Sequence, residues 1–323
     1  MSLTAAAAAL RDHERIVVVC HEAPDGDALG SLVGCGRALR RAGWDVVLWA
    51  PGEAPLPADY AWLGYDDLVR EPPADLHERL LLALDCGTAL RLGRDGEAAV
   101  ARAATSINID HHADNTHFAD INDVDATAAC ATVLCLRLLR LLELPLDHAT
   151  AEALYVGIVT DTGRFMFSNT NAEAHAGAAD LIALGVEPDA VFRRLYEGKP
   201  AARVRLLARA LATLDLRANG RLAVACISID DLERSGAEEA DSEGVIDHLR
   251  AIQGVEVAAV IREPRAGGGL LKKVSLRSAQ PDVDVARIAH VGGGGGHAMA
   301  AGFAMEGDFA HVIELIETEL TRA

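Results

Sequence analysis

The sequence lacks any stretch of about 18 uncharged apolar residues, so we expect no membrane span. The Ala-rich N-terminus, residues 2–10, has no basic leader, which predicts an opening helix rather than a signal peptide. The six cysteines show no C-x-x-C spacing, and most lie inside apolar segments. We therefore interpret them as reduced core residues of a cytoplasmic protein.

Positive charge is also scarce. Thirty lysines and arginines stand against 48 aspartates and glutamates, which gives a net charge of −18. This charge repels long polyanions and penalises extended tracking along DNA or RNA, so a nucleic-acid partner is expected to be short. Half of the residues are hydrophobic and 24% are charged, which indicates a folded protein, and 323 residues suffice for two domains.

The first half of the chain alternates short buried-type runs with helical segments. We expect strands at residues 15–20, 45–49, 80–84 and 106–109, and helices at residues 28–41, 97–104, 127–142 and 149–160. Continuous Val, Leu and Ile runs between helices predict an α/β fold with a parallel sheet covered on both faces. Ligands of such sheets collect outside the carboxyl ends of the strands.

The second half predicts a smaller α/β domain. Pro188, Gly198 and Pro200 indicate a break at residues 186–200, which is followed by a helix at residues 201–214. Further on we expect strands at residues 222–229, 255–262 and 270–277, an acidic helical segment at residues 238–251 and a glycine turn at residues 267–269. The predicted domains are residues 1–185 and residues 221–323, joined by a helical linker at residues 186–220, with the active site in the cleft between them.

Four clusters of acidic residues and histidines follow strand or helix ends, and in a parallel sheet such ends converge. Six of these side chains form a mixed oxygen and nitrogen set that suits Mn²⁺ or Mg²⁺: His21, Asp25, Asp27, Asp85, His111 and Asp161. Their carboxylates carry about −4, which two divalent cations balance. The sequence therefore predicts a two-metal hydrolytic centre, and chelation should loosen the first domain.

We assign catalytic roles to Asp85, Asp110 and His112. In a two-metal site one carboxylate commonly bridges, and a shared water becomes acidic enough to attack phosphorus. Asp85 is our choice for the bridge because it stands alone at a strand end. His112 is assigned to the substrate phosphate or the leaving oxygen, as a charge stabiliser or proton donor.

The second domain offers positive charge and bare backbone amides for an anionic group. Arg262, Lys272, Arg277 and His297 are candidates, and the amides of the run 292–296 can converge on a phosphate, aided by the dipole of a helix that we expect to start after it. Two alternatives stay open. The glycine run can be a flexible linker, and Arg262 and Lys272 can be solvated hairpin charges.

Four segments resemble the motifs of the DHH phosphoesterase superfamily: His21-x-x-Pro24-Asp25-Gly26-Asp27-Ala28-x-Gly30, Asp85-Cys86-Gly87, Asp110-His111-His112 and Asp161-Thr162-Gly163-Arg164-Phe165. The tail, with Val274-Ser275-Leu276-Arg277-Ser278 and Gly294-Gly295-Gly296-His297-x-x-Ala300-Ala301-Gly302, is similar to the DHH-associated substrate-binding domain.

Within that superfamily the chain resembles the bifunctional nanoRNases, which degrade very short oligoribonucleotides and remove the 3′-phosphate of 3′-phosphoadenosine 5′-phosphate (pAp) to leave AMP. The resemblance implies two Mn²⁺ ions, with Mg²⁺ as the alternative, on the six ligands given above. It also implies phosphate recognition on Arg277 and His297. The full set of expected substrate-binding residues is Arg262, Ser275, Gly295, Gly296, Arg277 and His297.

Two relatives are set aside by sequence, because family II pyrophosphatases have a different C-terminal domain and the long single-strand exonucleases are larger. Stand-alone cyclic-dinucleotide phosphodiesterases share this layout, so hydrolysis of c-di-AMP or pNpN stays an alternative. A non-enzymatic nucleotide sensor is disfavoured because all four motifs are intact. The expected partners are short oligoribonucleotides and pAp, with no long nucleic acid and no membrane, and a homodimer is left open.

Overall fold

The computed structural model describes residues 2–64, 67–267, 269–280 and 282–322, and it separates into two compact units, Met1–Glu197 and Gly198–Ala323. The expected glycine turn at residues 267–269 includes Gly268, which lies outside the described residues. Among the described helices, none combines the length and the apolar character that crossing a bilayer requires. The predicted linker boundaries at residues 186 and 220 stay predictions.

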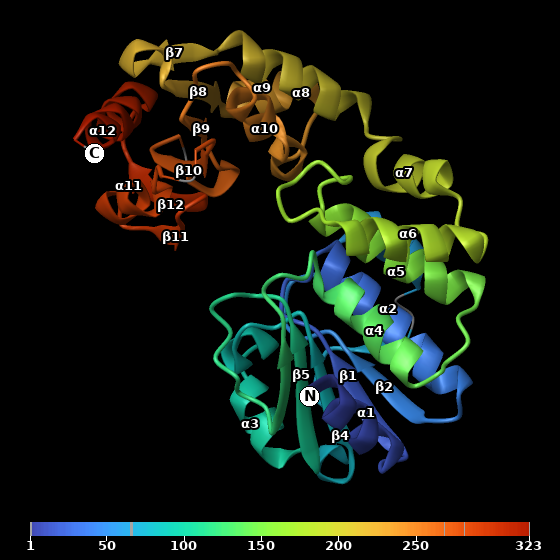
Figure 1. The fold of residues 1–323 in the computed structure, drawn as a ribbon. Helices are drawn as coiled ribbons and strands as arrows, with labels where there is room; N and C mark the ends of the chain where they lie inside the picture. Colours follow the sequence, from blue (N-terminus) through green and yellow to red (C-terminus); the bar gives the residue numbers. More distant parts are fainter. Residues whose placement is uncertain (1, 65–66, 268, 281, 323) are drawn as a thin grey trace. The chain divides into compact units, whose positions relative to one another are not determined.

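The first unit is built on a six-stranded, all-parallel sheet with the strand order β3-β2-β1-β4-β5-β6 (Figure 1). Its strands are β1 Arg15–Val19, β2 Asp45–Trp49, β3 Leu68–Val69, β4 Leu80–Leu84, β5 Thr105–Asp110 and β6 Ile121–Val124. All four expected strands are present. Sequence reasoning missed β3, which is two residues long, and β6, whose Ile-Asn-Asp-Val sequence has no apolar run.

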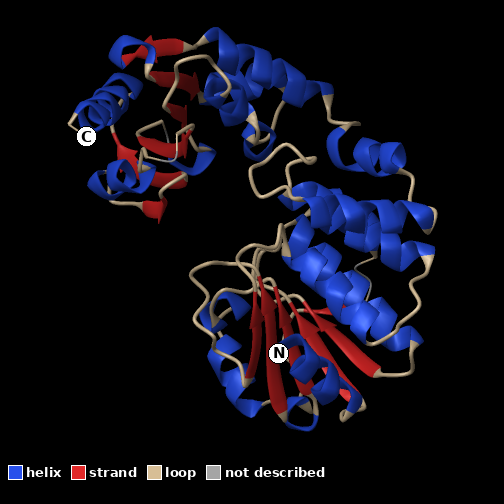
Figure 2. Ribbon diagram, viewed as in Figure 1, coloured by secondary structure: helices blue, strands red, loops and turns tan. Residues whose placement is uncertain are grey.

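Helices cover both faces of this sheet, as predicted (Figure 2). One face carries α1 Ser2–Arg11, α2 Gly26–Arg41, α4 Ala131–Leu141 and α5 His148–Asp161, with α6 Ala172–Ala183 packed beyond them. The other face carries α3 Gly96–Arg102. Short 3-10 turns lie at η1 Ala58–Leu63, η2 Leu76–Glu78 and η3 Ala89–Leu92. Because both faces are covered, every residue of β4 is buried.

Small residues let α2 and α5 approach each other closely. A Cβ atom added to Gly30 would lie 2.5 Å from the carbonyl oxygen of Ala153, and one added to Gly34 would lie 2.6 Å from Leu154 Cδ2. A Cβ atom added to Gly26 would likewise lie 2.4 Å from Oγ1 of Thr160. The close packing therefore holds the start of α2 against the end of α5, which carries the ligand candidate Asp161.

The predicted break at residues 186–200 is wrong in part, because α7 Pro188–Tyr196 forms a helix there. Pro188 opens the helix instead of interrupting it, since the first helical turn needs no amide donor from that residue. Val191 and Leu195 bury one face of α7 in the core of the first unit. The apolar spacing of residues 188–196 therefore favours a helix, although Gly198 and Pro200 follow it.

The second unit is a mixed six-stranded sheet with the strand order β11-β12-β10-β9-β8-β7, in which β8 and β9 are parallel and the other pairs antiparallel. Its strands are β7 Asp215–Arg217, β8 Leu222–Ile227, β9 Val257–Arg262, β10 Leu271–Ser278, β11 Gly295–His297 and β12 Ala300–Glu306. Its α-helices are α8 Ala201–Ala212, α9 Ile229–Ser235, α10 Val245–Arg250, α11 Val285–Val291 and α12 Phe309–Thr321. Its 3-10 turns are η4 Ala218–Gly220, η5 Glu239–Ser242 and η6 Arg265–Gly267.

The helix start expected after the glycine run does not exist. The run follows the C-terminus of α11, where Gly292 is the C-cap, and it leads into β11 and then β12. The glycine run thus lies at the C-terminal end of a helix, where the dipole does not favour an anion. The strand expected at residues 222–229 also ends early, because Ser228 caps α9 through its hydroxyl and the amide of Asp231.

Candidate metal centre and phosphate-binding face

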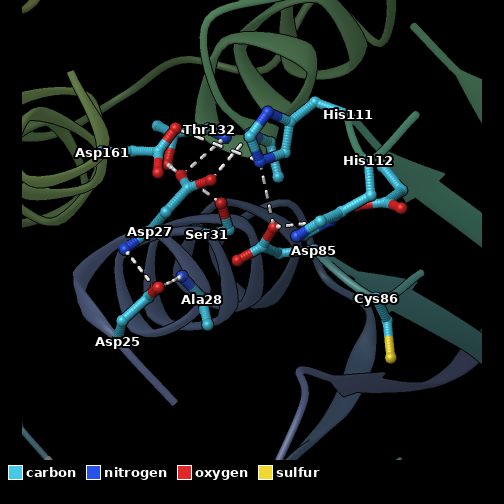
Figure 3. Close-up of polar contacts among 12 residues, drawn as sticks. Asp25, Asp27, Ala28, Ser31, Asp85, Cys86, His111, His112, Thr132 and Asp161 are labelled. Carbon is cyan, nitrogen blue, oxygen red and sulfur yellow. Dashed lines mark hydrogen bonds and ion pairs between the residues drawn. The ribbon is translucent and has the colours of Figure 1, made fainter. Parts of the chain in front are cut away.

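Three neighbouring strands of the first unit deliver site residues at one edge of the sheet. His21 follows β1, Asp85 follows β4 and His111 follows β5. The strand order reverses between β1 and β4, which is where ligands of open α/β sheets bind. Oδ2 of Asp85 lies 3.5 Å from Nε2 of His21, and Oδ1 of Asp85 lies 3.5 Å from Nε2 of His111, a contact that Figure 3 draws.

Asp85 is buried, with 3% of its surface exposed, and its backbone has a φ of +56°. Among the residues that the structure describes, none donates a hydrogen bond to the Oδ1 atom of this side chain. A buried carboxylate oxygen without a donor is costly unless a cation faces it. The surroundings of Asp85 therefore suit a carboxylate that binds a divalent cation better than a carboxylate with a purely structural role.

Asp25 and Asp27 begin α2 and point to different partners. Oδ1 of Asp25 caps the helix by accepting hydrogen bonds from the amides of Asp27 and Ala28, at 3.0 and 3.1 Å. Oδ2 of Asp27 accepts from the amide of Ala131 at 2.7 Å, and Oδ1 accepts from the amide and the hydroxyl of Thr132 at 2.9 and 2.5 Å. The first turn of α4 thus stabilises the Asp27 charge, a role for residues 131–132 that sequence reasoning missed.

Asp161 ends α5 and lies with Oδ2 4.0 Å from Nε2 of His111. The side-chain amide of Asn169 donates to Oδ2 and to the backbone carbonyl of Asp161, both at 3.1 Å, and to the carbonyl of Ala129 at 2.8 Å. Three consecutive residues after this point have positive φ, namely Gly163, Arg164 and Phe165. Asn169 therefore holds the carboxylate through a tightly turned connection.

Ligand atoms gather in three groups, within each of which they lie within 4.8 Å of one another. The groups are His21, Asp25 and Asp85, then Asp27, His111 and Asp161, and then Asp85, His111 and His112. The structure thus brings together all six side chains that the sequence proposed as metal ligands. It also brings in His112, which we had assigned to the substrate.

Without a cation, Asp27, His111 and Asp161 favour their protonated forms. Burial and the charges of Asp85 and Asp25 raise the pKa of Asp161 to about 6, although the nearby His111 lowers it. Burial, together with the charges of Asp85 and Asp161, also raises the pKa of Asp27. Burial opposes the charge on His111, but the nearby Asp85 and Asp27 carboxylates raise its pKa to about 9. Divalent cations would replace those protons, so the donor set fits a metal centre.

His112 is held by Asp110 rather than aimed at the centre of the cluster. Its Nδ1 lies 2.7 Å from Oδ1 of Asp110 and 3.7 Å from Oδ1 of Asp85. Asp110 is fully buried, whereas 45% of the His112 side chain is exposed. The hydrogen bond to Asp110 raises the pKa of His112. Since Nδ1–H donates to Asp110, Nε2 is the nitrogen left for a substrate.

Strand register in the second unit places most expected phosphate-binding residues on one face of the sheet. Ser275 of β10 pairs with Gly302 of β12, which pairs with Gly295 of β11, and the next row contains Arg277, Ala300 and His297. A Cβ atom added to Gly295 would meet only His290 Nε2, at 3.7 Å. The face therefore has open space beside a hydroxyl, a guanidinium and an imidazole.

Gly296 differs from Gly295. Its φ is +140°, and an added Cβ atom would lie 2.5 Å from Cα of Ala301. Glycine is needed at this position because two backbones approach each other closely, whereas an open surface lies beside Gly295. Any contribution of Gly296 to phosphate binding would come from its backbone amide.

Arg262 lies against Ser242 and Ser275. Its Nη1 and Nη2 donate to the two hydroxyls at 3.0 Å each, its Nε has no partner, and burial lowers its pKa. With Ser275 and Arg277 it lines a pocket of about 420 Å³ within the second unit. Arg262 is thus not a solvated hairpin charge.

Lys272 is wrong as a candidate for substrate contact. Only 2% of this residue is exposed, and its Nζ donates to the carbonyl of Gly269 at 2.5 Å. The same atom lies 3.3 Å from Oε1 of Glu263 and 5.0 Å from the ring centroid of Phe309. Period-2 alternation explains the difference, because Lys272 projects to the opposite face of β10 from Ser275 and Arg277.

Comparison with known proteins agrees with this architecture. The sequence model of the DHH family, N-terminal domain, matches residues 15–158, and that of the DHHA1 domain matches residues 219–322. A bifunctional oligoribonuclease and PAP phosphatase NrnA from Thermus thermophilus is 33% identical over 314 residues, which are 95% of this chain and 91% of the relative. The chain belongs to the DHH phosphoesterase family.

Two further proteins match this chain over most of its length. The bifunctional oligoribonuclease and PAP phosphatase NrnA of Bacillus subtilis is 28% identical over 90% of this chain and 89% of the relative. Among solved structures, an exopolyphosphatase-related protein from Bacteroides fragilis superposes with a TM-score of 0.89 at 23% identity, over 99% of this chain and 96% of that one. That likeness shows a shared fold through both units.

Proposed function

We propose that this DHH protein is a manganese-dependent phosphoesterase that hydrolyses very short oligoribonucleotides to mononucleotides and converts pAp to AMP. The observation that carries the proposal is the buried Asp85 carboxylate, which lies 3.5 Å from both His21 and His111. Support comes from two relatives of nearly the same length that are named oligoribonuclease and PAP phosphatase. We further propose residues 1–185 as the catalytic domain and residues 221–323 as the substrate-binding domain, joined by residues 186–220.

One Mn²⁺ would be held by His21, Asp25 and Asp85 and a second by Asp27, His111 and Asp161, and Asp85 would also face the second set, since its Oδ1 lies 3.5 Å from Nε2 of His111. These assignments follow two of the clusters described above, and Oδ1 of Asp85 supplies the oxygen that lacks a donor. When bound, such a pair of ions lowers the pKa of water and withdraws charge from the scissile phosphate.

The remaining steps belong to the side chains of the protein. A bond forms between a water oxygen and phosphorus, and the water releases a proton to solvent. The bond from phosphorus to the ribose oxygen breaks, and that oxygen takes a proton from the protein, which solvent later restores. We assign the proton to Nε2 of His112, because Nδ1 is engaged by Asp110 at 2.7 Å. The buried Asp110 carboxylate stabilises the imidazolium before the proton leaves.

The second unit would bind the phosphate that does not react. Arg277 offers a forked donor, and Ser275, His297 and the amides of Gly295 and Gly296 border the same region. Bound there, a terminal phosphate limits the substrate to short chains. The net charge of −18 adds to this limit by disfavouring long strands.

A side-by-side assay tests the proposal with pAp, the dinucleotide pApA, a 24-mer RNA and c-di-AMP under Mn²⁺. We expect AMP from pAp and pApA, and little cleavage of the 24-mer. Rapid c-di-AMP hydrolysis with inert pAp would instead assign the protein to cyclic-dinucleotide turnover. Titration calorimetry on chelator-stripped protein should show stoichiometric Mn²⁺ uptake, and no uptake would end the metal assignment.

A further inference from the structure

Asn115 lies at the centre of a hydrogen-bond network behind the exposed His112. Its Nδ2 is 2.6 Å from Oδ2 of Asp110, 2.8 Å from Oδ1 of Asn108 and 3.2 Å from the carbonyl oxygen of Cys86. Asp110 accepts from His112 through its other oxygen. The two oxygens of this buried carboxylate are thus divided between the imidazole and the Asn115 amide.

The orientation of the Asn115 amide is fixed by its partners. The amide has two N–H donors for three acceptors, and the two shortest contacts go to Asp110 and Asn108. Its Oδ1 accepts from the amide of His117 at 2.7 Å. A flipped amide would direct its oxygen at the Asp110 carboxylate and its nitrogen at the His117 N–H, so both contacts would turn repulsive.

Asn108 extends the network to the residue that follows Asp85. This asparagine is fully buried within β5, and its Nδ2 donates to the carbonyl of Cys86 at 3.1 Å. Burying a polar side chain in a central strand is unfavourable unless its hydrogen bonds are made. Here the two asparagine amides join the end of β4 to the carboxylate at the end of β5.

We propose that Asn115 is a positioning residue that fixes the Asp110 carboxylate and, through it, the His112 imidazole that faces the leaving oxygen. The inference rests on the proposed function for its catalytic meaning and on the contacts above for its geometry. Without Asn115, Oδ2 of Asp110 loses its 2.6 Å donor, and the carboxylate becomes free to rotate away from Nδ1 of His112. Nearly half of the His112 side chain is exposed, and its shortest polar contact is the one with Asp110, at 2.7 Å.

Two substitutions test this idea. Asn115→Ala removes the donor, and Asn115→Asp keeps the shape but replaces the donor by a carboxylate next to Asp110. We expect both variants to lower kcat on pAp by about 10- to 100-fold, while KM and the affinity for Mn²⁺ change by no more than about 2-fold. A role in packing alone predicts instead that the isosteric Asn115→Asp keeps wild-type kcat, and that result would overturn the proposal.

Asn122→Ala is the matched control. Asn122 lies in β6, just after the connection that contains Asn115, and its Nδ2 donates to the carbonyl of Ala119 in that connection at 2.6 Å. We expect near-normal kcat from this variant. A fall in kcat as large as that of Asn115→Ala would show that loosening the connection suffices, which also contradicts a specific role for Asn115.

A readout independent of turnover separates this inference from the proposed function. In the wild-type protein we expect an NMR resonance from the His112 Nδ1 proton, shifted downfield by its hydrogen bond to Asp110, and its loss in both Asn115 variants. If the wild-type protein is inert on all four substrates, the proposed function fails while this measurement still tests the geometry. An unchanged resonance in Asn115→Ala refutes the positioning role.

Discussion

The carboxylate of Asp27 and the hydroxyl of Thr132 lie 2.5 Å apart, although the two residues are 105 positions apart in the chain. The contact places a charged group of α2 on the first turn of α4, where two backbone amides also donate to it. It therefore couples the metal-binding edge to helix packing in the core of the first unit.

This contact predicts the effect of Thr132→Val. The variant keeps the volume of the side chain but removes the hydroxyl donor to a buried carboxylate, so we expect a loss of roughly 1.5–3 kcal/mol in the unfolding free energy of metal-free protein. Urea denaturation measures it. Ser31→Ala serves as the control, since the Ser31 hydroxyl contacts only the Thr132 hydroxyl in this chain of bonds, at 2.9 Å, and should matter less.

Asp85→Asn should abolish turnover and leave the protein folded. The amide removes the charge that both ions would share, so we expect kcat on pAp to fall by about 10³-fold or more, with an unchanged circular dichroism spectrum. Asp114→Asn removes an exposed carboxylate outside the three ligand groups and should stay active. Near-normal activity of Asp85→Asn would remove this residue from the mechanism.

Arg277→Ala should weaken substrate binding while the metal centre stays loaded. Losing a charge-assisted hydrogen bond of roughly 1.5–3 kcal/mol corresponds to a decrease of about 10- to 100-fold in kcat/KM. Steady-state kinetics with pAp and Mn²⁺ calorimetry check the two halves of this expectation. Lys273→Ala is the control, because it removes the same charge from an exposed position on the same strand. An equal effect of that substitution would show that positive charge in general, and not Arg277 in particular, supports binding.

Acid should destabilise the first unit partly through Asp125. Hydrogen bonds from Thr127 and Arg137 lower the pKa of Asp125 to about 2, and Arg137 also lowers the pKa of Glu173. A carboxyl with a depressed folded pKa contributes stability that is complete above its unfolded pKa of about 4 and is lost as the pH falls toward 2.

Arg137→Gln should therefore show a shallower loss of unfolding free energy than wild type between about pH 5 and pH 2, because it removes the cation that both carboxylates contact. Urea titrations at several pH values measure the slope. Arg140→Gln removes a cation of the same helix that pairs with Asp180, and it should leave the slope nearly unchanged. Parallel curves for wild type and Arg137→Gln would contradict the expectation.

Short-range pattern was enough for much of the site. The runs before His21, Asp85 and Asp110 predict strands because apolar residues follow one another without a break, and parallel strands bring their carboxyl ends to one edge. The ligand candidates that follow β1, β4 and β5 could be grouped on that basis, whereas Asp161 ends a helix, α5. The resemblance to the DHH superfamily then added an expected reaction and an expected substrate-binding role for the second domain.

Contacts between distant segments decided the rest. The sequence pattern did not indicate that α4 would donate to Asp27, that Asn115 would hold Asp110, or that Lys272 would be buried against Phe309. It also misplaced a helix after the glycine run, where a strand pairs with β12.

Local propensity depends on neighbours in the chain, and so the sequence by itself determined the strands that have continuous apolar runs, many of the helices and the polar residues at their ends, but not β3 or β6. Which donor satisfies which buried oxygen depends on how whole elements pack. Only the tertiary structure sets those distances, because a hydrogen bond requires atoms within about 3 Å, whatever their separation in sequence.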